Sequence, residues 1–75
     1  MKNLRYIREQ NGLSQIQLQM KTGIDQAMLS RYESGERTPS VEKLLILSRY
    51  FGTSVDYLLD LTDEPTPYPP KKAEG

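Results

Sequence analysis

The chain has 75 residues, which is enough for one domain with a modest apolar core, close to the lower size limit for independent stability. It contains no cysteine and no histidine, so a disulfide framework, a metal site with thiolate or imidazole ligands and a histidine proton shuttle are excluded. Its ten basic and ten acidic side chains cancel, so binding to a charged partner must depend on the positions of individual charges rather than on net charge.

The first predicted helix covers about residues 2–11, where apolar residues recur at helical spacing. Leu4 and Ile7 lie on the face that we expect to be buried. Gly12 follows and can adopt the left-handed conformation that ends a helix. No segment alternates apolar and polar residues as a strand does, so the predicted fold class is all-α.

Two short helices with similar N-terminal signals are predicted next. Ser14 is the N-cap candidate of the second helix, and Gln17 can complete a capping box with it. Asp25 is the N-cap candidate of the third helix, at about residues 26–34, and Gly23 can form the tight turn between the two. Each cap is bracketed by two apolar residues at the spacing of a hydrophobic staple, Leu13 with Leu18 and Ile24 with Leu29. This is the layout of a helix-turn-helix unit.

The last two helices are predicted to close the core. Ser40 can cap a fourth helix that ends at Gly52 and carries a broad apolar stripe: Val41, Leu44, Leu45, Leu47 and Phe51. Ser54 can cap a fifth, shorter helix with apolar residues on more than one side, too many for an exposed helix of a monomer. We therefore expect a homodimer interface formed by Tyr57, Leu58 and Leu61.

Beyond residue 61 the composition changes. Residues 62–75 contain four prolines and few apolar side chains, which opposes a regular helix and leaves little surface to bury. We predict a domain at residues 1–61 and a Pro-rich tail, extended or disordered, at residues 62–75.

Six short motifs, in this order and spacing, carry a resemblance to a known family. They are Leu4-Arg5-x-Ile7-Arg8, Gly12-Leu13-Ser14-Gln15-x-x-Leu18, Gly23-Ile24, Leu29-Ser30-Arg31-Tyr32-Glu33-Ser34-Gly35, Arg37-x-Pro39-Ser40 and Val55-Asp56-Tyr57-Leu58-Leu59. Across about residues 2–61 the chain resembles the phage-repressor family of helix-turn-helix proteins (Cro/CI-type, lambda-repressor-like). The resemblance implies a compact five-helix DNA-binding domain whose third helix lies in the major groove.

The resemblance also implies which residues contact DNA. They are Gln15, Asp25, Gln26, Ala27, Arg31, Ser34, Gly35 and Arg37. Gln15 would contact a phosphate or bridge a base and the backbone, the helix-three residues would face the groove, and the loop from Ser34 would bind phosphates. The side chains agree, because glutamine can pair with adenine, arginine with guanine and an alanine methyl with the thymine methyl. Simpler alternatives stay open: Gln26 as a solvated first-turn residue and Arg31 as a surface cation paired with acids.

Other positions concern the fold or depart from the family pattern. Arg8 and Glu33 match family positions that form an ion pair between helix one and the end of helix three. Gln19 stands where the family has a small residue, which implies either looser packing or a side chain that points outward. Asp25 replaces a common serine or threonine; its charge disfavours nearby phosphates unless it accepts from a cytosine amino group, so its role can be capping alone.

Two functions are compatible with these observations. The first is a dimeric repressor of transcription that binds double-stranded DNA, needs no cofactor and reads a pseudo-palindromic operator with half-sites roughly 34 Å apart. The alternative is a protein-interaction module such as an antitoxin or anti-repressor, with a regulatory protein partner; the neutral net charge and the Pro-rich tail keep it open.

An enzyme and a membrane protein are not expected. Asp56 and Asp60 are the only carboxylates whose helical spacing suggests a catalytic pair, and no metal ligand or nucleophile accompanies them. The longest apolar runs, such as residues 44–47, are too short for a signal peptide or a membrane span. We therefore expect a cytoplasmic protein.

Overall fold

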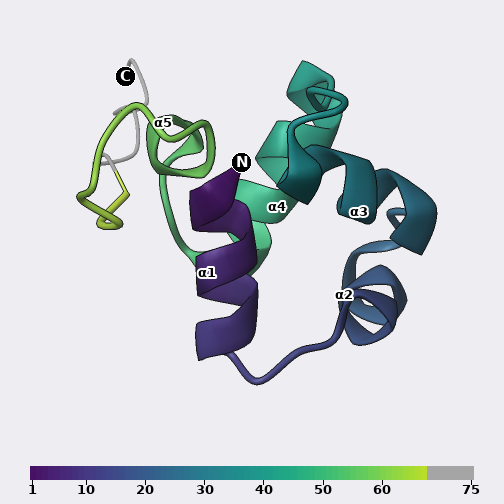
Figure 1. Cartoon of the computed structure of the whole chain (residues 1–75). Helices are drawn as coiled ribbons and strands as arrows, with labels where there is room; N and C mark the ends of the chain where they lie inside the picture. Colours follow the sequence, from purple (N-terminus) through teal and green to yellow (C-terminus); the bar gives the residue numbers. More distant parts are fainter. Residues whose placement is uncertain (68–75) are drawn as a thin grey trace, which may run out of the picture.

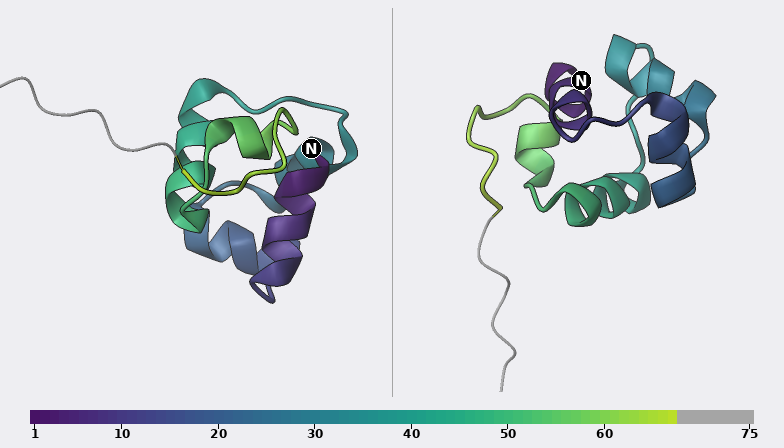
Figure 2. Two further views of the ribbon diagram at one scale, coloured as in Figure 1. Left: turned by 90° about the vertical axis from the view of Figure 1, so that its left-hand side faces the viewer. Right: turned by 90° about the horizontal axis from the view of Figure 1, so that it is seen from below.

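The computed structural model describes residues 1–67, which form five α-helices and no strand (Figure 1). The helices are α1 (Lys2–Gln10), α2 (Gln15–Thr22), α3 (Gln26–Ser34), α4 (Val41–Phe51) and α5 (Val55–Leu58). The predicted all-α, five-helix fold is confirmed. Two views agree that α2 and α3 lie on one side of α1 and α4, with α5 on the other side (Figures 1 and 2). No helix in this part of the chain has the length and apolar character needed to cross a membrane.

The predicted caps bound the helices. Ser14 Oγ accepts a hydrogen bond from the Gln17 N–H at 3.0 Å, and Gln17 Oε1 accepts from the Ser14 N–H at 2.8 Å, which is the predicted capping box. Asp25 caps α3 by accepting from the Ala27 N–H at 3.0 Å. Gly23, which follows α2, has a φ of 76° that favours glycine, and the chain can therefore turn tightly into α3.

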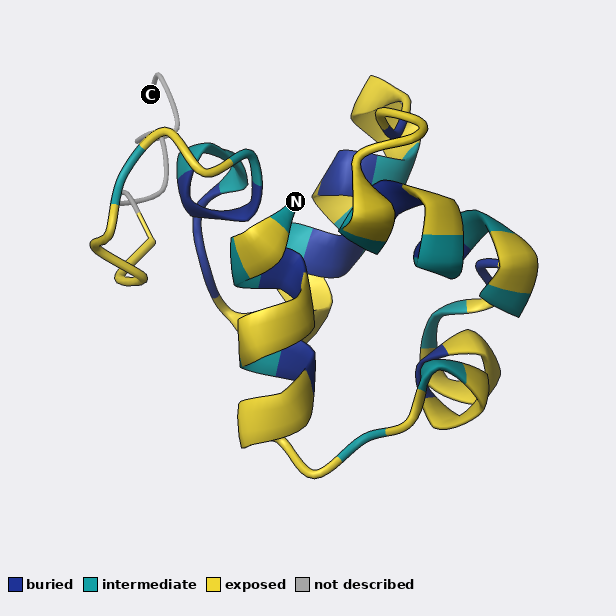
Figure 3. Cartoon of the chain, in the orientation of Figure 1, coloured by how far each residue is buried: buried dark blue, intermediate teal, exposed yellow. Residues whose placement is uncertain are grey.

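The apolar core is formed by side chains from all five helices and the α2–α3 turn. Its buried members, called the apolar core below, are Leu4, Leu18, Ile24, Leu29, Tyr32, Leu47 and Leu58. Figure 3 colours buried positions dark blue, and each of the five helices carries at least one of them. Both predicted staples contribute, since three of their four residues are fully buried and Leu13 packs against them. Burying one such side chain stabilises the fold by about 1.5–3 kcal/mol.

The stripe on α4 is broader than the face that α4 buries. Leu44 and Leu47 are buried, whereas Val41 is 72% exposed and Leu45 is 38% exposed. Helical spacing indicates which residues form the apolar stripe. It does not indicate how much of that stripe the other helices cover. The remaining part faces outward.

The fifth helix is shorter and better buried than expected. It ends at Leu58, and Asp60 adopts a left-handed φ of 63° that stops any continuation. Tyr57 is 6% exposed and Leu58 is fully buried, because α5 packs against both α1 and α4. A single chain therefore already covers two of the three residues predicted to form a dimer interface. Leu61, at 71% exposed, is the member of that set that a second copy could reach.

The first part of the predicted tail lies against the domain. Thr53 Oγ1 donates to the carbonyl of Pro65 at 2.5 Å, and Asn3 Nδ2 donates to the carbonyl of Thr62 at 3.1 Å. The Asp60 carboxylate accepts from the first N–H groups of α1, those of Lys2 at 2.9 Å and Asn3 at 2.8 Å. Residues 62–67 are non-helical and keep contacts with the helical domain at Thr62 and Pro65. Residues 68–75, the rest of that predicted tail, lie outside the described residues.

Candidate nucleic-acid interface

The fold gathers the predicted DNA-contacting residues at one surface. Leu29 and Tyr32 turn one face of α3 into the apolar core, so the opposite face of that helix carries Ala27 and Arg31 into solvent. Gln15, at the first position of α2, is half-buried beside α3. The remaining predicted residues lie at the two ends of α3: Asp25, Gln26, Ser34, Gly35 and Arg37.

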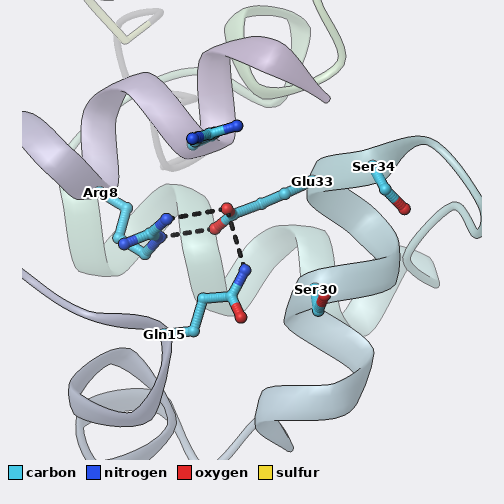
Figure 4. Close-up of a pocket in the computed structure, with 6 residues that line it drawn as sticks. Arg8, Gln15, Ser30, Glu33 and Ser34 are labelled. Atoms are coloured by element: carbon cyan, nitrogen blue, oxygen red, sulfur yellow. Dashed lines mark hydrogen bonds and ion pairs between the residues drawn. The ribbon is translucent and has the colours of Figure 1, made fainter.

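A chain of polar contacts joins the first three helices beside this surface. Arg8 of α1 donates from Nε and Nη2 to the two carboxylate oxygens of Glu33, at 2.6 and 2.9 Å. Gln15 Nε2 donates to Glu33 Oε1 at 3.2 Å, and Gln26 Nε2 donates to Gln15 Oε1 at 2.7 Å. Figure 4 shows the side chains of Arg8 and Gln15 converging on Glu33. These four residues are called the polar junction below.

The Arg8–Glu33 ion pair has the predicted partners and is almost fully enclosed, with side-chain exposures of 10% and 5%. Its hydrogen bond to Glu33 raises the pKa of Arg8 above the usual arginine value, so the guanidinium stays charged. Arg8 Nη1 also donates to the carbonyl of Leu13 at 2.6 Å, which ties α1 to the segment before α2. A buried pair of this kind fixes geometry more than it adds net stability.

The polar junction determines which way the Gln26 amide faces. Glu33 Oε1 accepts from the Nε2 group of Gln15, which turns the Gln15 oxygen toward α3. That oxygen in turn holds the Nε2 group of Gln26. Gln26 is left with a free carbonyl oxygen and one spare N–H, which is the donor and acceptor pair that matches the major-groove edge of adenine.

The N-terminus of α3 is capped by two side chains. Asp25 accepts from the Ala27 N–H, and Gln19 Oε1 accepts from the Gln26 N–H at 2.7 Å. Gln19 is exposed, so the outward orientation is the one that occurs. Because it reaches from α2 to the first turn of α3, its departure from the small residue of the family has a structural reason. Asp25 acts as a cap, and its exposed carboxylate stays on the predicted DNA side.

Arg31 is paired with an acid in the free chain. Its Nε lies 3.5 Å from Glu36 Oε2, and both side chains are exposed. This is the arrangement that the simpler alternative described. An exposed pair is worth little, because water and salt screen it, so Arg31 can exchange Glu36 for another anion at small cost.

The loop after α3 uses its own backbone donors. The Gly35 N–H donates to the carbonyl of Tyr32 and the Arg37 N–H to that of Arg31, both at 3.2 Å, and Ser34 Oγ donates to the same Arg31 carbonyl at 3.1 Å. Backbone contacts from these N–H groups to phosphates would require those bonds to break. The exposed side chain of Arg37 needs no such change.

A polar hollow of about 310 Å³ lies where α1, α2 and α3 meet, and it is called the α1–α3 hollow below. It is lined by Arg5, Arg8, Gln15, Ser30, Glu33 and Ser34 (Figure 4). The sequence motifs indicate no role for Arg5 or Ser30. Ser30 could have been found, because it lies one helical turn after Ala27 and so shares its face of α3. Within residues 1–67 no group of three or more Asp or Glu side chains could hold a metal ion.

Comparisons with known proteins identify relatives of this chain. A helix-turn-helix family matches residues 4–58. The chain is 42% identical over 64 residues to YobD of Bacillus subtilis and 36% identical over 66 residues to y4dJ of Sinorhizobium fredii, both described as uncharacterized HTH-type transcriptional regulators. YqaE of Bacillus subtilis, with the same description, is 37% identical over 57 residues. These matches cover 85%, 88% and 76% of this chain, and 57%, 84% and 49% of the respective relatives. No solved structure matches the chain significantly.

Proposed function

Because the chain belongs to the helix-turn-helix family, we propose that it is a DNA-binding regulator of transcription, acting as a repressor that reads a pseudo-palindromic operator with α3 in the major groove. The descriptions of YobD, y4dJ and YqaE as transcriptional regulators support the general role. The exposed outer face of α3, which carries Ala27 and Arg31, supports the placement of that helix.

The orientation of Gln26 is the observation that carries the proposal. A solvated first-turn glutamine has no need of a fixed amide, yet Gln26 is held by Gln15, which is held in turn by Glu33. Binding costs less when a side chain is already in its bound orientation. An amide with a preset free edge at the start of an exposed helix is therefore suited to reading one base, with adenine as the best match.

The other residues of this surface have complementary roles in the proposal. Arg31 exchanges Glu36 for the two acceptors of guanine, and the Ala27 methyl contacts a thymine methyl. Arg37 binds a backbone phosphate, which fixes position without reading sequence. Asp25 remains a cap whose charge lowers affinity for phosphates nearby.

We also propose that the operator is bound by a homodimer formed around Leu61. Asp60 binds the first N–H groups of α1, so Leu61 lies beside the start of that helix, and Tyr6 follows one turn later. Both are large, apolar and exposed, at 71% and 56%. A two-fold contact would bury both patches at once and hold two copies of α3 at half-sites roughly 34 Å apart.

Selection of bound duplexes from a random pool tests the proposed function. The expected result is enrichment of a pseudo-palindrome, with affinity that falls linearly as salt rises on logarithmic axes. Binding without enrichment would contradict sequence-specific reading. Absence of binding would contradict the DNA role and favour a protein-interaction module instead.

Arg31, in the last turn of α3, and Arg37, in the loop after it, provide a matched test of their roles. Arg31→Ala should cost about 1–3 kcal/mol of discrimination at one base position. Arg37→Ala should weaken binding to all duplexes alike and reduce the salt slope by about one unit per site. The assignments are wrong if Arg37→Ala changes one base preference or if Arg31→Ala changes none.

Leu61→Glu tests the dimer. The added charges would oppose a contact between copies, so sedimentation equilibrium should show a shift toward monomer and operator affinity should fall. Val41→Glu is the matched control, because Val41 is equally exposed but lies at the start of α4. A parent that stays monomeric at high concentration, or equal effects of the two variants, would remove Leu61 from the interface.

A further inference from the structure

The α1–α3 hollow lies beside the outer face of α3, and two of its lining residues, Arg5 and Ser30, have no role in the proposed function so far. We propose that it binds one phosphate group of the DNA backbone, with Arg5 and Ser30 as contacts that neither the sequence motifs nor the relatives assign. The inference rests on the proposed DNA-binding function and adds a phosphate site to it.

The hydrogen-bonding capacity of the hollow suits an anion. Both oxygens of Glu33, the one carboxylate in the lining, already accept bonds from Arg8 and Gln15. Donors are left over, because Arg8 uses three of its five N–H groups and Gln15 one of two. The hydroxyl of Ser30 adds another donor at the wall of the hollow. A ligand that mainly accepts hydrogen bonds therefore fits.

The net charge of the hollow suits a phosphodiester, which carries one negative charge. Arg8 and Glu33 neutralise each other, so Arg5 supplies the remaining positive charge of the lining. Arg5 lies 3.5 Å from Glu9 Oε2 on the same helix, in a pair whose side chains are both more than half exposed. Such a pair is weak, so the guanidinium of Arg5 is available to a phosphate at little cost.

The position of the hollow favours DNA over a free anion as the source of the phosphate. Ser30 lies one turn from Ala27, so the hollow borders the face of α3 that would enter the groove. A helix with its side chains is about 10–12 Å wide and the major groove about 12 Å, so the phosphates of the groove wall must pass close to the flanks of α3. The flank toward α1 and α2 contains the hollow.

Substitution of Arg5 tests the proposal in the full chain. Arg5→Gln should lower affinity for operator and unrelated duplexes by the same factor and make the salt slope shallower by about 0.9 unit, the value for one lost phosphate contact. Between about 50 and 200 mM salt, the variant would then lose about threefold less affinity than the parent. Arg5→Lys should restore the slope, because it keeps the charge. All three residues have similar helix propensities, so folding of α1 is preserved.

Arg49→Gln is the matched control. Arg49 is also exposed, but it lies near the end of α4 beside α5, outside the α1–α3 hollow. The proposal is overturned if Arg5→Gln leaves the salt slope unchanged, or if Arg49→Gln reduces the slope equally, since the effect would then be one of total charge.

A titration of the DNA-free protein with inorganic phosphate, followed by NMR, separates failure of the hollow from failure of the proposed function. The side-chain amide of Gln15 and the backbone amide of Ser30 should shift saturably in the parent and not in Arg5→Gln. Shifts without any effect of Arg5→Gln on DNA binding would mean that the hollow takes free phosphate only, which overturns the DNA assignment. If the parent binds no duplex, the proposed function fails and the DNA assignment fails with it, whatever the phosphate titration gives. If the parent binds DNA, but Arg5→Gln leaves the salt slope unchanged and phosphate shifts neither amide, only the phosphate site in the hollow is rejected.

Discussion

The polar junction lies among α1, α2 and α3, whereas the apolar core draws on all five helices, and the two constrain the molecule differently. Leu47 and Leu58 are fully buried in the core, where packing is non-directional and any side chain of suitable volume contributes. Arg8 and Glu33 are almost as well enclosed, yet each of their contacts requires a donor to face an acceptor. The core therefore provides stability, whereas the polar junction fixes the orientation of side chains, including the amide of Gln26 on the outer surface.

The largest expected change in stability comes from removing one member of the buried ion pair in the polar junction. Glu33→Leu leaves the charge of Arg8 enclosed without its carboxylate, which should lower the free energy of unfolding by about 3–5 kcal/mol in urea denaturation. The double variant Arg8→Met with Glu33→Leu removes both charges and should recover stability, since replacing a buried ion pair by apolar residues is often neutral or favourable.

The same double variant separates the effect of the ion pair on the stability of the fold from its effect on the orientation of Gln26. It gives Gln15 no carboxylate to donate to, so the preference of Gln26 for its base pair should weaken even though the fold is intact. A double variant with parental stability and undiminished operator discrimination would show that the junction does not orient Gln26.

A cavity in the apolar core should lower stability without changing base preference. Leu47→Ala should cost about 2–5 kcal/mol of unfolding free energy, because it removes a fully buried side chain and the helices around it can relax only partly. The control Leu45→Ala, on the exposed side of the same helix, should cost less than about 1 kcal/mol. Base preference measured on the folded fraction should be unchanged in both, and a changed preference in Leu47→Ala would mean that core packing also sets the geometry of α3.

Substitutions of Gln15 and Gln26 test the part of the polar junction that lies next to the outer face of α3. Gln26→Ala should cost about 1–3 kcal/mol of discrimination at one base pair, and Gln15→Leu should cost less at that same base pair because it only releases the amide. The two losses should be non-additive in the double variant, since each acts through one contact. Competition binding against operators altered one base pair at a time measures all three. Losses at different base pairs would contradict the coupling.

The smallest expected effect is a dependence of stability on alkaline pH that arises beside the core. Burial, helped by the nearby charges of Tyr6, Asp63 and Asp60, raises the pKa of Tyr57 above its ordinary value of about 10. Once the pH passes that ordinary value, the unfolded chain releases this proton while the folded chain keeps it. Stability should therefore fall with rising pH until the folded pKa is reached.

Tyr57→Phe isolates this effect. The variant should lose less stability between about pH 9 and 11 than the parent, as followed by urea denaturation at each pH. Tyr50→Phe removes a phenol from a more exposed position and serves as the control. Equal alkaline losses in parent and Tyr57→Phe would assign the dependence to other groups.

Much of the fold could be predicted because the signals are local. The hydroxyls of Ser14, Ser40 and Ser54 each accept from a backbone N–H three residues later, a contact that depends only on the chain near the cap. The left-handed φ of Gly23 is likewise a property of one residue. The partners of Arg8 and Glu33 came instead from the family resemblance, since nothing local relates positions so far apart.

What the tertiary structure alone decided is which surfaces are covered and which amides face which way. Helical spacing marked Tyr57, Leu58 and Leu61 as apolar, but only the packing of α1 and α4 around α5 buries the first two and leaves the third exposed. The orientation of Gln26 depends on Gln15, on a neighbouring helix. Burial and hydrogen bonds between helices arise from their relative positions, and the periodicity of one segment holds no information about where another segment lies.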